Sequence, residues 1–151
     1  MNAPVLELDP HAFEDLFVGQ RAEITRCVSS SDVVGFAEIS GDRNPIHLSD
    51  HFAAHTPFKS RIAHGLYTAS LISAVLGTRL PGPGAIYLSQ TLKFLAPVHI
   101  DDEVTVVVTV EELQPEKNRA RLACLCSVGD HPVLQGEALV MVPRREDLYP
   151  A

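Results

Sequence analysis

Residues 65–76, which read GLYTASLISAVL, decide the fold. These residue types favour a helix, and the apolar ones occur on every side, interrupted only by Tyr67, Thr68, Ser70 and Ser73. A helix that is apolar all round is normally a buried one. Gly77 and then Pro81 end it. We therefore predict a helix buried at the centre of the fold.

Beyond Pro83-Gly84 the apolar side chains recur with a period of two. The pattern covers residues 86–94, 104–110, 122–128 and 134–142, and a further strand is expected near 22–28. Successive alternating segments separated by turn residues predict an antiparallel sheet. One buried helix and one such sheet give an α+β fold in which the sheet curls around the central helix.

The 151 residues form one domain in this interpretation, with loose ends at about 1–12 and 144–151. A single curled sheet of this size leaves an edge and part of the helix uncovered. We therefore expect a homodimer that continues the sheet or covers the flank of the helix.

Charge excludes two classes of partner. The chain has 12 Lys and Arg residues against 19 Asp and Glu residues, a formal net charge of −7. Proteins that bind nucleic acid or anionic membranes usually have a basic surplus, so we expect neither. The longest stretch without charge, residues 65–78, is too short and too rich in Ser and Thr to span a bilayer.

The cysteines and residues 1–10 together predict the cellular compartment. Cys27, Cys124 and Cys126 make no even-numbered disulfide framework, and the last two should share one face of a strand. Residues 1–10 carry two acidic residues, no Lys or Arg and no long apolar run, unlike a signal peptide. We expect free thiols and a cytoplasmic protein.

The most informative segment for chemistry is SGDRNPIH, residues 40–47. Serines 29–31 can cap a helix over about 32–40, Gly41 ends it, and Ser49 can cap a short helix to about residue 54. Between them, Asn44-Pro45 fixes a turn through which Asp42 and His47 can meet, as general acid and base catalysis needs. The alternative is that Asp42 only caps a turn and His47 is an ordinary loop histidine.

His64-Gly65 opens the buried helix. The first N–H groups of a helix lack partners within it, and its positive dipole end favours an acceptor with negative charge. Gly65 has no side chain, so a substrate oxygen can approach the backbone closely. Alternatively, Gly65 eases packing, and water or a carboxylate occupies the donors.

Three histidines spaced by four, His47, His51 and His55, invite a metal interpretation. Pro45 and the Ser49 cap place the first of them before the helix, and no H-E-x-x-H pattern supplies a base. We predict no metal.

Three stretches resemble one family. They are FAEISGDRNPIH at 36–47, RIAHG at 61–65 and PGAIYLSQTLKF at 83–94. In this order they look like the MaoC-like dehydratases, most closely the (R)-specific enoyl-CoA hydratases, over residues 16–143. The resemblance implies a hot-dog fold, in which an antiparallel sheet wraps a long helix, and a homodimer.

The resemblance also implies roles for single residues. Asp42 and His47 would bind the water that adds to the double bond, and the backbone N–H of Gly65 would stabilise the oxyanion. Ser73 would border the active site, unless its hydroxyl bonds back to its own helix. Substrate contacts would come from Asn44, for which holding the turn is the alternative role, and from His64 and Leu66.

No organic or metal cofactor is implied, because coenzyme A arrives as part of the acyl-CoA thioester substrate. Lys59, Arg61 and Lys93 are candidates for its phosphates. Acyl chain length, an acyl-carrier-protein substrate and the pathway, for which polyester synthesis is one suggestion, stay open. The rival functions are an acyl-CoA thioesterase, disfavoured because residues 66–80 contain no Asp or Glu, and a non-catalytic acyl-CoA binding module.

Overall fold

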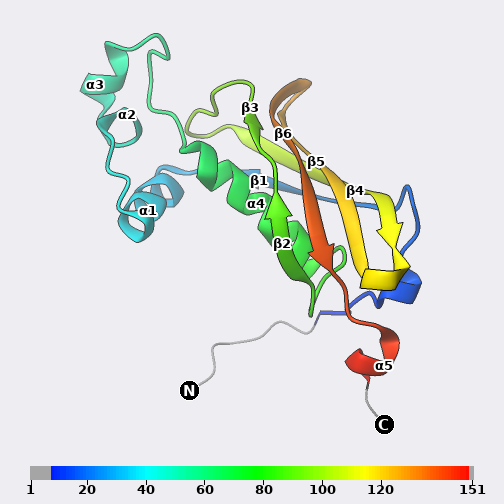
Figure 1. Ribbon diagram of the computed structural model, residues 1–151. Coiled ribbons are helices and arrows are strands. Elements are labelled where there is room, and N and C mark those ends of the chain that lie inside the picture. Colours follow the sequence, from blue (N-terminus) through cyan, green and yellow to red (C-terminus); the bar gives the residue numbers. More distant parts are fainter. Residues whose placement is uncertain (1–7, 150–151) are drawn as a thin grey trace, which may run out of the picture.

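A computed structural model describes residues 8–149 and shows one antiparallel sheet around one long helix (Figure 1). The strands run in the order β1-β4-β5-β6-β2, and β3 also pairs with β6. Their bounds are β1 Arg21–Cys27, β2 Ile86–Gln90, β3 Lys93–Phe94, β4 Glu103–Gln114, β5 Arg119–Val128 and β6 His131–Met141. The predicted extra strand near residues 22–28 is β1, at one edge of the sheet.

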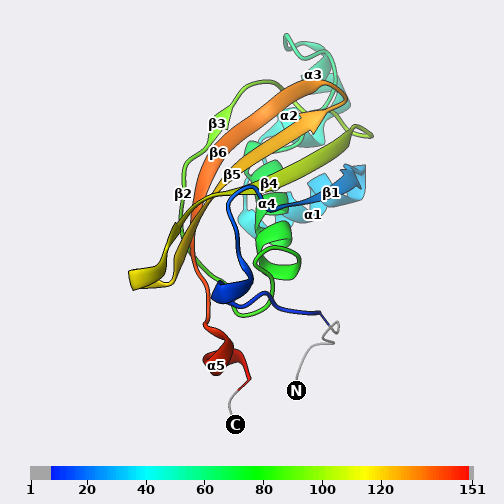
Figure 2. The same cartoon turned by 90° about the vertical axis from the view of Figure 1, so that its right-hand side faces the viewer.

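Helix α4, Gly65–Thr78, lies against the concave face of the sheet, which wraps around it in the view of Figure 2. Its buried side chains include Leu71, Ile72, Val75 and Leu76. They join the alternate valines of β4, at positions 104, 106, 108 and 110, in one hydrophobic core. Burying each such side chain contributes roughly 1.5–3 kcal/mol. The prediction of an α+β fold with the sheet curled around a central helix is confirmed.

Three short helices project beyond the end of the sheet, before the chain returns to start α4 (Figures 1 and 2). They are α1 Ser30–Ser40, α2 Pro45–Leu48 and α3 Asp50–Ala54, and we call residues 30–54 the overhanging segment. Ser29 and Asp32 form a reciprocal capping box at the start of α1, and Gly41 ends it at φ 80°. The hydroxyl of Ser49 accepts the N–H of Phe52 at the start of α3, so the predicted caps of α1 and α3 are confirmed.

Helix α2 differs from the sequence prediction, in which Asn44-Pro45 forms only a turn. Proline fits the first position of a helix, where its missing N–H would have no partner in any case. The Asn44 side chain accepts a hydrogen bond from the N–H of Ile46 and so caps this new turn. His47 consequently lies in a helix of its own and not in a loop before one.

The strand predicted over residues 86–94 is two strands. The carbonyl of Thr91 passes over Gly136 of β6, where a Cβ atom would lie only 1.8 Å from its oxygen. Thr91 also bonds to the backbone of Glu137 in both directions, through its own N–H and its hydroxyl. This crossing separates β2 from β3. Ile86 and Leu88 are exposed on β2, which ends the sheet.

The described parts of both termini are attached to the fold. Ala12 is buried before the 3-10 turn η1, Phe13–Asp15. Helix α5, Arg145–Leu148, begins with an ion pair to Asp15. A second 3-10 turn, η2 Pro115–Lys117, joins β4 to β5. Of the predicted loose ends at about 1–12 and 144–151, residues 1–7 and 150–151 lie outside the described residues.

Two further findings bear on sequence expectations. Within residues 8–149, no helix is long and apolar enough to cross a membrane. All three cysteines are free; Cys124 and Cys126 are buried on the same face of β5, as predicted. Burial raises the pKa of Cys124 to about 11 and that of Cys126 to about 12, so both stay protonated at neutral pH.

The crossing at Gly136 leads to a stability prediction. Gly136→Ala should lower the free energy of unfolding by about 1–3 kcal/mol, because the new methyl group meets backbone that cannot rotate away. Gly35→Ala is the matched control, since it adds a methyl group in open space within α1 and should stabilise by up to about 1 kcal/mol. Urea unfolding of both variants measures the difference, and equal stabilities would contradict this account of the strand break.

Candidate active site

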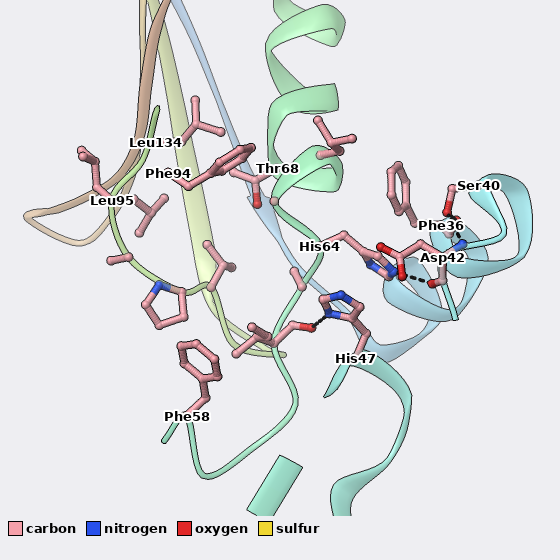
Figure 3. Close-up of a pocket in the computed structure, with 18 residues that line it drawn as sticks. Phe36, Ser40, Asp42, His47, Phe58, His64, Thr68, Phe94, Leu95 and Leu134 are labelled. Carbon is pink, nitrogen blue, oxygen red and sulfur yellow. Dashed lines mark hydrogen bonds between the residues drawn. The ribbon is translucent and has the colours of Figure 1, made fainter. Parts of the chain in front are cut away.

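A pocket of about 590 Å³ opens between the overhanging segment, the start of α4 and the β3 edge of the sheet (Figure 3). Its two ends differ in character. Asp42, His47 and His64 gather at one end, and the wall at the other end is apolar. The apolar wall comprises Phe58, Phe94, Leu95, Ala96, Pro97, Val98, Val133 and Leu134. Such a pocket suits a ligand with an apolar tail and a reactive polar head.

His47 is buried in α2, and one bond fixes its ring. Its Nδ1–H donates to the carbonyl oxygen of Ile62 at 2.7 Å. The neutral ring therefore carries its free lone pair on Nε2. Burial, reinforced by the neighbouring His64, lowers the pKa of His47 against the opposing effects of the Ile62 bond and Asp42. At neutral pH this imidazole is a proton acceptor.

Asp42 lies in the turn after α1 and is exposed. Its N–H donates to the hydroxyl of Ser40 at 3.1 Å, and its carboxylate accepts the N–H of Asn44 at 3.2 Å. Ligand atoms of Asp42, His47 and His64 lie within 4.8 Å of one another. The predicted convergence of Asp42 with His47 is therefore present in the structure.

The sequence predicted His64 only as a substrate contact. In the structure it also packs closely against His47 and Asp42. Its ring stacks on that of His47, with centroids 3.7 Å apart, and meets Phe36 at 4.9 Å. Its Nε2–H donates to the backbone carbonyl of Asp42 at 2.9 Å. The side chain is only 3% exposed, and its Nδ1 has no partner among the described residues. His64 thus contacts both Asp42 and His47.

The start of α4 faces the same pocket. The N–H groups of Tyr67 and Thr68 bond to the carbonyl of His64. In the described part of the chain, neither Gly65 nor Leu66 has an acceptor for its N–H. These two donors, at the positive end of the helix dipole, can bind an oxygen that gains negative charge.

Gly65 has a steric reason to be glycine. A Cβ atom at this position would lie 2.6 Å from the ring of Phe94, which belongs to β3. The aromatic ring therefore lies directly beside the helix start, and both residues line the pocket. The sequence suggested that Gly65 lets a substrate approach the backbone closely. In the structure, the side chain of Phe94 also approaches it closely.

A family comparison agrees with this geometry. Residues 18–123 match the model of the MaoC like domain, which is more than half of the chain. The chain belongs to the MaoC-like domain family. The resemblance stated from the sequence is confirmed.

Individual relatives narrow the comparison within the MaoC-like family. A 3-hydroxybutyryl-CoA dehydratase of Methylorubrum extorquens is 71% identical over 91% of this chain and 88% of its own. An (R)-specific enoyl-CoA hydratase of Rhodospirillum rubrum is 53% identical over 89% of this chain and 94% of its own. The solved unliganded (R)-hydratase of Pseudomonas aeruginosa superimposes with a TM-score of 0.88 at 45% identity, covering 91% of this chain and 89% of that one. The hot-dog fold is thereby confirmed.

Two candidate residues of this MaoC-like chain lie away from the pocket. Ser73 is exposed on the outer side of α4 and is absent from the pocket lining, so its place in the site stays a prediction. Asn44 is exposed and caps α2, which is the turn-holding role offered beside substrate contact. Leu66, by contrast, lines the pocket and is 60% exposed.

The three candidates for binding phosphate differ in exposure. Lys59 and Lys93 are exposed, and both are free of ion pairs in the described chain. Arg61 is half-buried and turned inward, where its Nε–H donates to the carbonyl of His47 at 2.6 Å and its Nη1 to the hydroxyl of Ser30 at 3.0 Å. Arg61 is thus committed to the protein, unlike the two lysines.

The structure groups different potential metal ligands from the three histidines that the sequence suggested. His51 and His55 contact each other on α3, whereas His47 faces the pocket. Two imidazoles and a carboxylate, from Asp42, His47 and His64, are instead the group whose spacing could hold a divalent ion. One nitrogen of each ring already donates to a backbone carbonyl. The absence of a metal stays a prediction.

Sequence reasoning missed most of the apolar wall. Phe58, Leu95 and Pro97 stand in loops or beside the two-residue strand β3, where no periodicity marks them. Leu134 was placed correctly in an alternating strand, but the pattern did not show that it reaches a pocket. Only the path of the chain after β3 brings these side chains together.

Proposed function

We propose that this protein is an (R)-specific enoyl-CoA hydratase. It adds water across the double bond of a trans-2-enoyl-CoA to give an (R)-3-hydroxyacyl-CoA, and it catalyses the reverse dehydration. The names of the relatives support this proposal, since they are a 3-hydroxybutyryl-CoA dehydratase and an (R)-specific enoyl-CoA hydratase.

One observation carries the proposal. A neutral imidazole and a carboxylate, from His47 and Asp42, stand at the same end of an apolar pocket as the free N–H groups of Gly65 and Leu66. Addition to an enoyl thioester needs these two kinds of group together. The first handles protons, and the second stabilises charge on the thioester oxygen.

The water has two acceptors in this arrangement. The lone pair on Nε2 of His47 can accept one of its hydrogens, and the carboxylate of Asp42 can accept the other. As the water oxygen bonds to C3, the pair takes one proton from it and delivers a proton to C2. The pair ends the reaction in its starting protonation state, so no cofactor is consumed. The proton transfer is assigned to the pair and not to either group alone.

Charge on the substrate is stabilised at the start of α4. When water attacks C3, negative charge moves through C2 onto the thioester oxygen. The N–H groups of Gly65 and Leu66 are fixed before the reaction and need no reorientation. One such donor typically contributes about 3 kcal/mol to lowering the barrier.

Coenzyme A is part of the substrate in this proposal and not a resident cofactor. The acyl tail occupies the apolar wall that includes Phe58, Phe94 and Leu134. Lys59 and Lys93 remain candidates for the phosphates, because both are exposed. The free thiols of the described chain fit a reducing compartment, and we propose that the protein acts in the cytoplasm.

Two other functions of the same fold fit less well. A thioesterase of this fold would place a carboxylate on the central helix, and α4 contains none. A binding module without activity would not need the acid–base pair beside the free N–H groups. Both rivals give different results in the assay that follows.

The purified protein should consume crotonyl-CoA, measured as loss of the enoyl-thioester absorbance, and chiral analysis should show the (R)-3-hydroxy product. Asp42→Asn and His47→Gln should each lower kcat by about a hundredfold or more, because each removes a proton acceptor. Circular dichroism confirms that the variants are folded.

Each rival has its own signature in this assay. Release of free coenzyme A thiol without hydration would favour the thioesterase. Tight acyl-CoA binding without turnover, equal in the parent and in Asp42→Asn, would favour the binding module. Either outcome rejects hydration.

Gly65→Ala tests the role of the helix start. The methyl group would crowd the ring of Phe94, which is 53% exposed and can move, so the variant should fold. It should nevertheless lose about a hundredfold in kcat, because the methyl group and displaced ring stand over the N–H donors. Gly77→Ala, at the other end of α4 and in open space, is the control. A Gly65→Ala variant as active as this control would disprove the role.

We also propose that the protein is a homodimer. Strand β2 ends the sheet and exposes Ile86, Tyr87 and Leu88. The outer side of α4 exposes Leu66 and Ser73. A second copy that continued the sheet at β2 would protect this edge and lie near the uncovered side of α4.

The mass in solution tests this arrangement. Light scattering should give twice the 16.4 kDa of one chain. Leu88→Lys, which places a charge on the exposed edge, should shift the mass toward that of a monomer. Glu38→Lys on α1 is the control and should leave the mass unchanged, whereas a monomeric parent would exclude the dimer.

A further inference from the structure

Arg61 makes contacts that a phosphate-binding arginine would not need. It is half-buried, and its Nε–H donates to the carbonyl oxygen of His47 at 2.6 Å. Its Nη1 donates to the hydroxyl of Ser30, the first residue of α1, at 3.0 Å. Its Nη2 is shielded from solvent and has no partner in residues 8–149. The guanidinium group therefore joins two parts of the overhanging segment.

The neighbours of Arg61 bind the same segment. The carbonyl of Ile62 accepts Nδ1–H of His47, and the N–H of Ile62 reaches the carbonyl of Ile46 at 3.4 Å. The ring of His64 donates to the carbonyl of Asp42. Arg61, Ile62 and His64 thus fix both members of the acid–base pair, and they lead directly into the helix start that binds the oxyanion.

We propose that Arg61 is a positioning residue for the hydration reaction, holding His47 through its backbone carbonyl, and that it does not bind the phosphates of coenzyme A. This inference rests on the proposed function. It revises the role that the sequence suggested for Arg61, and it assigns the contact with His47 a part in catalysis.

The shape and charge of the side chain support this role. A guanidinium group is planar and carries donors in a fixed fork, so two bonds define the position of both partners. A lysine has one flexible ammonium group and cannot make the same pair of bonds in one geometry. Among the described residues, no carboxylate lies within 4.0 Å of Arg61. Backbone and hydroxyl oxygens are therefore the groups that offset its partial burial.

Two substrates separate positioning from phosphate binding. Crotonyl-CoA carries phosphates, and the N-acetylcysteamine thioester of crotonic acid carries none. Arg61→Met should lower kcat by about 10 to 100-fold with both substrates, because small displacements of a reacting group have effects of this size. KM should change by less than about threefold, since the substrate loses no contact. Arg61→Lys should recover part of the rate, because one donor to His47 is restored.

Three controls accompany these variants. Ser30→Ala removes only one of the two bonds of Arg61 and leaves the Ser29 cap of α1 intact, so it should fold and lose a smaller part of kcat. Arg79→Ala removes an exposed arginine at the far end of α4 and should keep the parent's rate. NMR of the imidazole protons should show the Nδ1–H signal of His47, assigned with His47→Gln, shifted or lost in Arg61→Met and unchanged in Arg79→Ala.

These experiments distinguish a failure of the Arg61 proposal from a failure of the proposed function. A loss confined to crotonyl-CoA, with raised KM, would assign Arg61 to the phosphates and overturn the proposal. Full activity of Arg61→Met would overturn it as well. Should Arg61→Met fail to fold, Ser30→Ala and Arg61→Lys decide by the same comparison of substrates. A folded parent that hydrates neither substrate would instead reject the proposed function, and the His47 signal still tests the contact with Arg61.

Discussion

The hydrogen bond from Nδ1 of His47 to the carbonyl of Ile62 is the contact on which the geometry of the site depends. It sets which ring nitrogen carries the lone pair, and it turns that nitrogen toward Asp42 and the pocket. The ring can then stack on His64, which in turn holds the backbone of Asp42. The overhanging segment projects beyond the end of the sheet (Figure 1), so these contacts with residues 61–64 define where its reactive groups stand.

The second constraint comes from α4. Because one side of α4 is strongly apolar, the sheet wraps around that side, and the edge strand β3 comes to lie at the start of the helix. Phe94 then packs against Gly65 so closely that no larger residue fits without displacing the ring. The first N–H groups of the helix face the pocket, whose lining is largely apolar, so an electrostatic contact there is stronger than in bulk water.

Much of this could be predicted from the sequence, and the missed parts share a cause. Periodicity predicted α4 and the strands of the sheet, and local chemistry together with a family resemblance predicted Asp42, His47 and Gly65. Contacts between segments far apart in sequence were missed. The passage of Thr91 over Gly136 splits a strand that looks continuous, and Arg61 turns inward because acceptors from α1 and α2 lie there. No local pattern records either event.

The two ends of the pocket are built from separate stretches of chain. Residues 36–64 supply the polar end, whereas most of the apolar wall comes from residues 94–98 and 133–134. A change in the second group reshapes the room for a hydrocarbon tail without touching the hydrogen bonds that orient the imidazole. Substitutions in the apolar wall can therefore change the acyl chain length that such a protein prefers, while the reaction that it catalyses stays the same.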